Sequence, residues 1–564
     1  MVVPRRAQRR LVSLAALALV LALAAAAPVR AAPPPVLTEG EAVAALLDDP
    51  KVTDWLDRYA PSPSTDAEFE EGTQRWTVHV RLGPAGEVAT GVVDDATGKV
   101  VEAWTGPQVA WKMARGGEGA FGGRVLTSMP VWLTLCAVFL VGLADLRRPL
   151  SLRNLDLIGL LSFTLSWWFF ERGEVFRSVP LATASLAYLL GRMLWIGLRG
   201  RALPPTRPLL PLWLLAAVAV FLGGFRLGLD VAEPPPVIDV GYASVVGAHR
   251  ILHGEAPYGH MPVRDTLRPC EPDAPSDARD RIQSNGRCES AVERGDTYGP
   301  ATYLAYVPAV AALGWSGRWD RLPAARWTAL GLDLLTLAGL VVVGLRHGGR
   351  RLAVLLGFGW VAFPFTTYLL LSAANDALVP ALLVWGFAAA SSPWGRGALG
   401  SLAGMAKFAP LVVAPLWLTY PATRLRDAWR FAAAFGLAAL ATLSILLLEP
   451  GLVDAARTFF DRTLGFQLGR HSPFSIWDWG QYHAAGIPDL RIGQRLLQGV
   501  VLGLALVVAV VPRRKGPLEL AALTAAVLVA LQLVLTHWFY LYLPWVLPFT
   551  LLALLLGRTD APRA

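Results

Sequence analysis

Long apolar stretches recur along most of this 564-residue chain, separated by short charged links from about position 125 to the end. Each stretch has roughly the length that an α-helix needs to cross a bilayer. The pattern therefore predicts a polytopic α-helical membrane protein with about 13 spans after a signal sequence. These spans are expected over 125–144, 155–170, 180–198, 209–229, 297–313, 325–345, 352–371, 376–390, 398–418, 431–448, 496–511, 518–535 and 539–556.

The first 32 residues have the parts of a secretory signal. Four arginines between positions 5 and 10 precede an apolar run over 11–27, and the small residues Ala31 and Ala32 follow. We expect the next segment to begin outside the cytoplasm. An uncleaved signal anchor is the alternative, and it leaves the topology downstream unchanged.

Residues 33–118 are polar, and their pattern predicts a small extracytoplasmic α+β domain. A helical stretch over 39–57 precedes alternating segments over 76–82, 87–93 and 99–104, and the turn 94–98 joins the last two as a hairpin. The run VVDDATGKVV at 92–101 resembles the PepSY-type domain, which implies that the domain binds or inhibits a partner. A two-layer domain with no separable activity is the alternative.

Span parity and charge agree in most links. Arg147 and Arg148, the links 199–207, 318–326, 424–430 and 513–515, and the C-terminus all fall inside, as expected for basic loops. The basic link 346–351 falls outside, which implies either a re-entrant span or contact with outer lipid phosphates. The two longest loops between spans, 230–296 and 449–495, also lie outside, and any chemistry is expected there.

Composition supports this description. The chain is 54% hydrophobic, and its net charge of +9 comes from clusters between apolar stretches, so nucleic acid is not an expected partner.

Of the three cysteines, Cys270 and Cys288 share the first outer loop, where an oxidising compartment favours a disulfide between them over two unpaired thiols.

The first outer loop places three carboxylates, Asp230, Glu233 and Asp239, just beyond a span. The stretch 240–252 is helical in pattern and apolar enough to lie along the interface, so Asp239 would stay ionised at the helix N-terminus. Asp230 and Glu233 are further candidates for a base or for metal ligands. No compact cluster has metal-ligand spacing, so we expect no tightly bound cofactor or metal, and a divalent cation stays an open question.

Several segments resemble the GT-C superfamily of glycosyltransferases, most of all its bacterial polyprenyl-phosphate-mannose-dependent branch. The segments that carry the resemblance are IDVGY at 238–242, AHRILHGEAPYG at 248–259, TYGPATY at 297–303, NDAL at 375–378, AKFAP at 406–410, the loop 459–479 and HWFYLY at 537–542. Gly299 stands where that branch has the first proline of a Tyr-Pro-Pro segment. The likeness covers about 209–556 and leaves the three accessory spans of 125–200 unassigned.

The resemblance and the chemistry together suggest a set of site residues. Asp239 is the expected general base for the acceptor hydroxyl, and the departing phosphate needs cationic or N–H donors. Candidates for binding the donor phosphate are Arg250, Lys407, Arg470 and His471. Candidates in the substrate loops are Tyr242, Tyr258, Tyr298, Gln467, Trp477, His537 and Tyr540.

Each candidate has a structural alternative. The alternative role for Asp239 is to cap its helix without taking part in catalysis. The alternative for Arg250 and Arg470 is binding to lipid headgroups, and the alternative for Lys407 is a structural ion pair with Asp376. His471 could be an ordinary interfacial histidine.

The leading hypothesis is an inverting glycosyltransferase of the plasma (inner) membrane with its active site on the extracytoplasmic side. It would move a sugar, mannose or another hexose or pentose, from a polyprenyl-phosphate donor to a lipid, glycan or protein acceptor. One alternative is a transporter or lipid flippase, with Lys407, Asp376 and Asp333 along its path. Another is an inactive membrane scaffold whose exported domain senses a partner.

Overall fold

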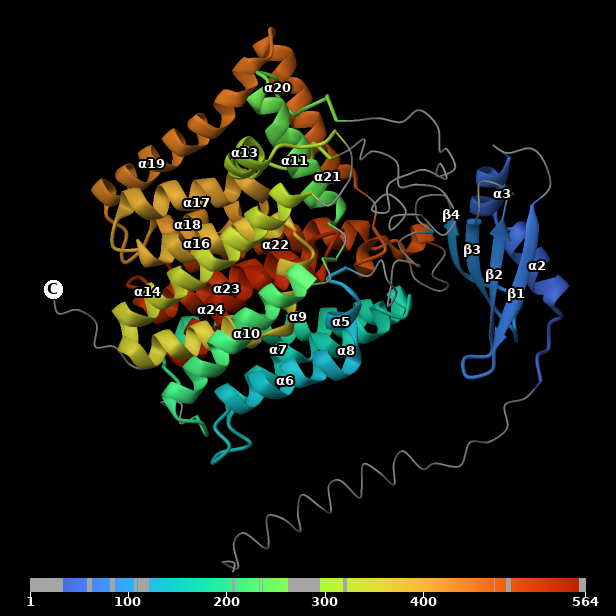
Figure 1. Ribbon diagram of the computed structural model, residues 1–564, viewed down its shortest axis with the longest axis horizontal. Coiled ribbons are helices and arrows are strands. Elements are labelled where there is room, and N and C mark those ends of the chain that lie inside the picture. The colour runs from blue at the N-terminus through green and yellow to red at the C-terminus, as the bar shows by residue number, and fades with distance from the viewer. Residues whose placement is uncertain are drawn as a thin grey trace, which may run out of the picture.

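The structure is a computed structural model in which a helical bundle lies beside a small sheet domain (Figure 1). It describes residues 34–57, 63–81, 87–105, 109, 121–204, 208–232, 234–235, 237–261, 295–317, 322–470, 472–482 and 488–556. The predicted signal at 1–32 and the cysteines Cys270 and Cys288 lie outside these residues.

The sheet domain has two short helices packed against a four-stranded antiparallel meander in the order β1-β2-β3-β4, which confirms an α+β unit. Its elements are α2 (Glu39–Leu47), α3 (Pro50–Leu56), β1 (Ser64–Glu70), β2 (Arg75–Arg81), β3 (Glu87–Asp94) and β4 (Val100–Thr105). The strand β1 was not predicted, because this edge strand is exposed or half-buried along its length and lacks an apolar face.

Local chemistry fixes the ends of these elements. Thr38 and Glu41 form a capping box at the start of α2. At the β3–β4 hairpin, Asp95 accepts hydrogen bonds from the backbone N–H groups of Val36 and Leu37 at 2.8 and 2.9 Å and from Trp76 Nε1 at 2.9 Å. Burial alone would raise the pKa of this carboxyl group, but the three donors outweigh it and hold the pKa below its ordinary value.

Six helices of the described chain are long and apolar enough to cross a membrane, which supports an integral membrane protein. They are α9 (Val175–Arg199), α10 (Leu212–Ala232), α14 (Pro323–Ala362), α19 with η4 (Leu425–Leu448), α22 (Arg491–Val510) and α23 (Pro517–Val534).

Shorter elements complete the bundle. They are α5 (Arg124–Thr127), α6 (Met129–Leu143), α7 (Leu152–Leu161), α8 (Phe163–Phe170), α11 (Asp239–Leu252), α13 (Pro300–Leu313), α15 (Pro364–Leu371), η2 (Asn375–Ala377), α16 (Leu378–Ala388), α17 (Pro393–Lys407), η3 (Ala409–Val413), α18 (Ala414–Leu418), α20 (Leu452–Phe460), η5 (Asp461–Gly465), α21 (Phe466–Gly469), η6 (Ile476–Tyr482), η7 (Tyr540–Tyr542) and α24 (Leu543–Leu555). The accessory helices α6 to α9 belong to the same hydrophobic core as α23 and α24.

The helix α14 reverses direction at Gly349, whose φ of 65° ends the first half of the element. Gly344 lies against the Ala353 backbone, so the two halves form an antiparallel hairpin. Arg326 at its start pairs with Asp230 at the end of α10, at 2.6 Å. The start of α14 therefore lies at the same end of the bundle as the first outer loop, and the expectation that the link 318–326 lies on the opposite side was wrong for residues 322–326. Residues 318–321 lie outside the described residues.

A second reversal occurs inside the predicted span 398–418. Lys407 ends α17, Phe408 has a φ of 54°, and η3 and α18 return beside α17. Arg396 near the start of α17 donates to the carbonyl oxygens of Trp417 at 2.8 Å and Tyr420 at 2.6 Å, which closes this hairpin.

These two corrections change the predicted side of the basic link 346–351. The two ends of the bundle are named here the site end, which holds Asp239 and Lys407, and the basic end. Arg346 donates to the carbonyl oxygen of Ala388, and Arg396 to that of Ala390, so the link 346–351 lies at the basic end. Its three arginines thereby join the basic residues of the 424–430 and 513–515 links, as the positive-inside bias predicts, whereas Arg326 lies at the site end.

Candidate functional site

Asp239 is the first residue of α11, which begins one residue before the predicted start at 240. Its side chain is exposed, and the N-cap residue is Ile238, with no side-chain capping bond at this end of the helix. The capping alternative for Asp239 is therefore not what the structure shows. Residues 241–248 of α11 are all buried under neighbouring elements, so the helix is packed within the protein. Its position along the membrane interface stays a prediction.

Close packing fixes the first turn of α11. A Cβ atom on Gly241 would come within 2.6 Å of the Ala373 carbonyl oxygen, so only glycine permits this approach. Asn375 Nδ2 donates to the Val240 carbonyl oxygen at 3.2 Å and to Ser244 Oγ at 3.0 Å. Asp239 is thereby held beside the turn that connects α15 to α16.

That turn carries Asp376, which forms a buried ion pair with Lys407 at the end of α17. Lys407 Nζ lies 3.3 Å from Asp376 Oδ1, and the two side chains are 9% and 2% exposed. The ion pair that the sequence analysis considered for Lys407 is confirmed. Ala373 and Phe408, which flank the two charges, have φ values of 48° and 54°. Non-glycine residues in this region are strained, and such strain concentrates at functional sites.

Tyr298 covers this ion pair, with its ring centroid 4.2 Å from Lys407 Nζ. The next residue, Gly299, donates from its backbone N–H to the Ala406 carbonyl oxygen at 3.0 Å. A Cβ atom on Gly299 would overlap the Met405 carbonyl oxygen. The departure from a Tyr-Pro-Pro segment thus has a physical reason, because the backbone here packs directly on the end of α17.

Substitution Gly299→Ala should disrupt this contact. The added methyl group meets backbone rather than a flexible side chain, so we expect a loss of stability of about 1–3 kcal/mol and displacement of Lys407. Gly499→Ala in α22 is the matched control, since nothing lies within 4 Å of its Cβ position. Thermal unfolding of both purified variants checks this, and an unchanged midpoint for Gly299→Ala would contradict the close packing.

Arg470 approaches from the second outer loop. Its Nη2 lies 3.3 Å from His537 Nε2, and His537 Nδ1 lies 2.9 Å from Ser472 Oγ. His537 lies between α23 and η7, outside the spans. Burial, and then the positive charges of Arg470 and Lys407, lower its pKa well below the usual range. The ring is therefore neutral, and Nε2 can accept the hydrogen bond from Arg470 while Nδ1 donates to Ser472.

Electrostatic interactions connect these groups into one site. Asp239 interacts with Tyr298, Asp376, Lys407 and Tyr542. Arg470 interacts with Tyr298, Lys407, His537 and Tyr542. The name polar cluster is used below for these seven residues: Asp239, Tyr298, Asp376, Lys407, Arg470, His537 and Tyr542.

Hydrogen bonds and an ion pair connect the two outer loops beside the polar cluster. Buried Asp296 accepts from the Gly259 N–H at 2.7 Å and pairs with Arg462 Nε at 3.4 Å. Glu449 accepts from the Ala256 N–H at 3.1 Å. The sequence analysis did not single out Asp296 or Tyr542, although each lies next to or within a segment that it quoted. Only their contacts distinguish them from other polar residues of the loops.

Other predicted site residues lie apart from the polar cluster or serve the framework. Arg250 pairs with Glu255 at 2.7 Å near the far end of α11, roughly 16 Å along the helix from Asp239 at a rise of about 1.5 Å per residue. Tyr540 is buried, with its hydroxyl group 2.7 Å from Ser166 Oγ. Gln467 is exposed on α21. His471 lies outside the described residues.

Two tyrosines and a tryptophan support the loops. Tyr258 donates to the Tyr298 carbonyl oxygen at 3.0 Å, and Tyr242 is buried near Trp315. Trp477 Nε1 donates to the Leu533 carbonyl oxygen at 2.9 Å. These residues therefore shape the surroundings of the polar cluster.

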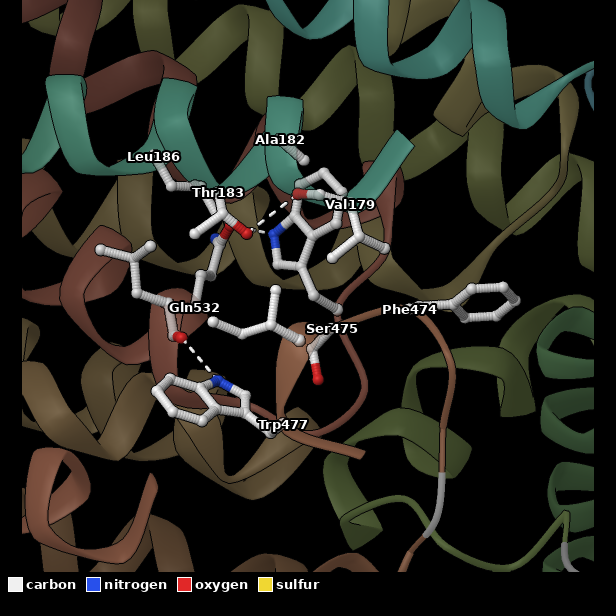
Figure 2. Close-up of a pocket in the computed structure, with 11 residues that line it drawn as sticks. Val179, Ala182, Thr183, Leu186, Phe474, Ser475, Trp477 and Gln532 are labelled. Atoms are coloured by element: carbon white, nitrogen blue, oxygen red, sulfur yellow. Dashed lines mark hydrogen bonds between the residues drawn. The ribbon is translucent and has the colours of Figure 1, made fainter. Parts of the chain in front are cut away.

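A small pocket lies under the second outer loop, between α9, the segment leading into η6, and α23 (Figure 2). Val179 and Thr183 line it from α9, while Ser475 and Trp477 face them across the pocket. Its lining is mainly apolar and includes no member of the polar cluster.

The polar cluster brings an exposed carboxylate together with two cations, and this arrangement can take a proton and stabilise an anion at the same place. In the part of the chain that the structure describes, no group of three or more His, Cys, Asp or Glu side chains is placed to hold a metal ion. No protein family, curated protein or solved structure matches this chain. The polar cluster itself is therefore the basis for a functional assignment.

Proposed function

We propose that this protein is a membrane glycosyltransferase of the GT-C type. It transfers a sugar from a polyprenyl-phosphate donor to an acceptor outside the cytoplasm, with inversion at the anomeric carbon. The observation that supports this most is the polar cluster. Exposed Asp239 begins the helix that is hydrogen-bonded to the turn carrying Asp376, and Asp376 pairs with Lys407 at 3.3 Å. Mannose or a similar sugar is the donor group that the sequence resemblance favours.

The position of the polar cluster suits a lipid-borne donor. The sugar and phosphate of such a donor stay at the membrane surface because the isoprenoid chain stays in the bilayer. A short loop follows the membrane helix α10, and Asp239 comes directly after that loop. Lys407 is the last residue of α17. Both groups therefore lie at helix ends, and the proposal puts the donor phosphate beside them.

The charges suit the departing phosphate. When the bond between the anomeric carbon and the phosphate oxygen breaks, negative charge develops on that oxygen. Arg470 and Lys407 supply positive charge there, and an arginine can bind a phosphate group with two parallel N–H donors. The Asp376 carboxylate, 3.3 Å away, favours the charged form of the buried Lys407 side chain.

Asp239 supplies the base. The acceptor hydroxyl oxygen attacks the anomeric carbon from the face opposite the phosphate, which inverts the configuration, and its proton passes to the Asp239 carboxylate. A carboxylate is a weak base, so the proton moves late, after bond formation has made the attacking oxygen acidic. The polyprenyl phosphate then leaves as an anion bound by Arg470 and Lys407.

The transporter alternative has less support. Asp333, which a transport path would use, accepts from Arg226 at 2.8 Å and from Trp360 Nε1 at 2.9 Å inside the bundle. This ion pair connects α10 to α14, and both side chains are almost fully buried. Its contacts are those of a structural link between helices.

The test is a transfer assay with the full-length protein in lipid nanodiscs. A polyprenyl phosphate carrying radiolabelled mannose is supplied together with envelope glycolipid acceptors, and label is followed from donor to acceptor. We expect an inverted glycosidic product and free polyprenyl phosphate in equal amounts. In sealed vesicles, movement of intact donor across the bilayer without transfer would instead support a transporter. Absence of both transfer and movement would contradict both functions.

A further inference from the structure

The last strand of the sheet domain is attached to the helical bundle. Trp104 of β4 is fully buried, yet it belongs to the hydrophobic core of the bundle, whereas its neighbour Ala103 belongs to that of the sheet domain. Its ring lies 5.8 Å from that of Phe176 in the first turn of α9. Figure 1 shows β4 as the strand nearest the bundle. Trp104 is therefore a side chain through which the sheet domain docks on the bundle.

The contact continues from Phe176 into the second outer loop. The Phe176 ring meets that of Trp479 edge to face at 5.4 Å, and Trp479 belongs to η6. Trp479 Nε1 donates to the Pro473 carbonyl oxygen at 3.1 Å, and Asp478 accepts from the Ser472 N–H at 3.0 Å. Thus η6 folds back and holds the backbone at residues 472–473.

From Ser472 the contacts reach the polar cluster. Ser472 Oγ binds His537 Nδ1 at 2.9 Å, and His537 Nε2 faces Arg470 Nη2 at 3.3 Å. Figure 2 shows the segment that carries Phe474, Ser475 and Trp477 lying against α9, the helix that also carries Phe176. One face of this loop therefore contacts α9. Ser472, which precedes this segment, contacts the histidine ring that faces Arg470.

We propose that Trp104 is a positioning residue, and that docking of the sheet domain through Trp104, Phe176 and η6 orients Arg470 toward the donor phosphate. The sheet domain thereby acts on the site without contributing a group to it. The docking follows from the contacts alone, while the effect on donor binding rests on the proposed function. A guanidinium group displaced by about 1 Å loses much of its effect on a reacting group, so a loosened loop should weaken donor use.

Hydrogen exchange of the full-length protein in nanodiscs tests the docking. Trp104→Ala should speed exchange over residues 472–482, and Trp104→Phe should leave it near the wild-type rate, because phenylalanine keeps a ring for the contact. Phe176→Ala removes the other side of the contact, leaves the sheet domain unchanged and should have the same effect. Phe69→Ala is the control, since β1 lies at the opposite edge of the sheet. Unchanged exchange in both alanine variants overturns the inference.

The transfer assay tests the positioning role. Trp104→Ala and Phe176→Ala should raise the KM for the polyprenyl-phosphate donor about tenfold or more and leave the KM for the acceptor near its wild-type value. Trp104→Phe should restore the donor KM. An unchanged donor KM despite faster exchange overturns the positioning role. A wild-type protein without transfer activity would count against the proposed function instead, and the exchange measurement would still decide the docking.

Discussion

Asp239→Asn should lower the rate of sugar transfer by about 100-fold or more, because general bases contribute about 10²- to 10⁴-fold to such reactions. Asparagine has the same shape but cannot accept the acceptor proton. The side chain is exposed and makes no capping bond, so the substitution removes no contact on which the fold depends. The loss should appear in kcat, with little change in the KM for the donor, as expected for a group needed in the transition state.

Glu255→Gln is the matched control for Asp239→Asn. It removes a carboxylate from the same outer loop, where Glu255 pairs with Arg250 at the surface. Exposed pairs of this kind contribute little, so transfer should stay near the wild-type rate. Transfer at the wild-type rate in Asp239→Asn would exclude Asp239 as the base.

Lys407→Met should abolish transfer and also destabilise the protein. It leaves the Asp376 carboxylate buried without its cation, and breaking such a buried pair costs about 3–5 kcal/mol. The double variant Lys407→Met with Asp376→Asn buries no charge, so it should recover most of the lost stability. It should stay inactive, because the donor phosphate has still lost a cation.

The comparison of single and double variants separates the two roles of Lys407. Thermal unfolding midpoints in nanodiscs report stability, and the transfer assay reports function. If the double variant recovers transfer together with stability, Lys407 is only one half of a structural ion pair. Recovery of stability alone supports a role in binding the phosphate.

Several features could be predicted from the sequence because they depend on local patterns. Apolar runs of bilayer length indicated the membrane helices, and the alternation over 76–104 indicated three of the four strands. The helical pattern over 240–252 indicated α11, which begins one residue earlier, at Asp239. The fourth strand, β1, was missed because an exposed edge strand has no apolar alternation to detect.

The course of the chain between the spans could not be predicted in the same way. Hydropathy measures the length of an apolar segment and not its direction, so the start of α14 was put at the wrong end of the bundle and the α17–α18 hairpin was taken for a single helix. The reversal at Phe408 depends on a backbone angle, and the position of the start of α14 depends on the ion pair of Arg326 with Asp230. Both are set by contacts distant in the sequence.

The sequence by itself determined the class of molecule, its α+β domain and most of the charged candidates, because composition and periodicity are properties of neighbouring residues. Only the tertiary structure decided which candidates meet. It brought Asp239 near Lys407, gave Arg470 a neutral histidine as partner, and put Arg250 in a surface pair. The physical reason is that a charge buried near a membrane needs a partner, and packing of distant helices chooses that partner.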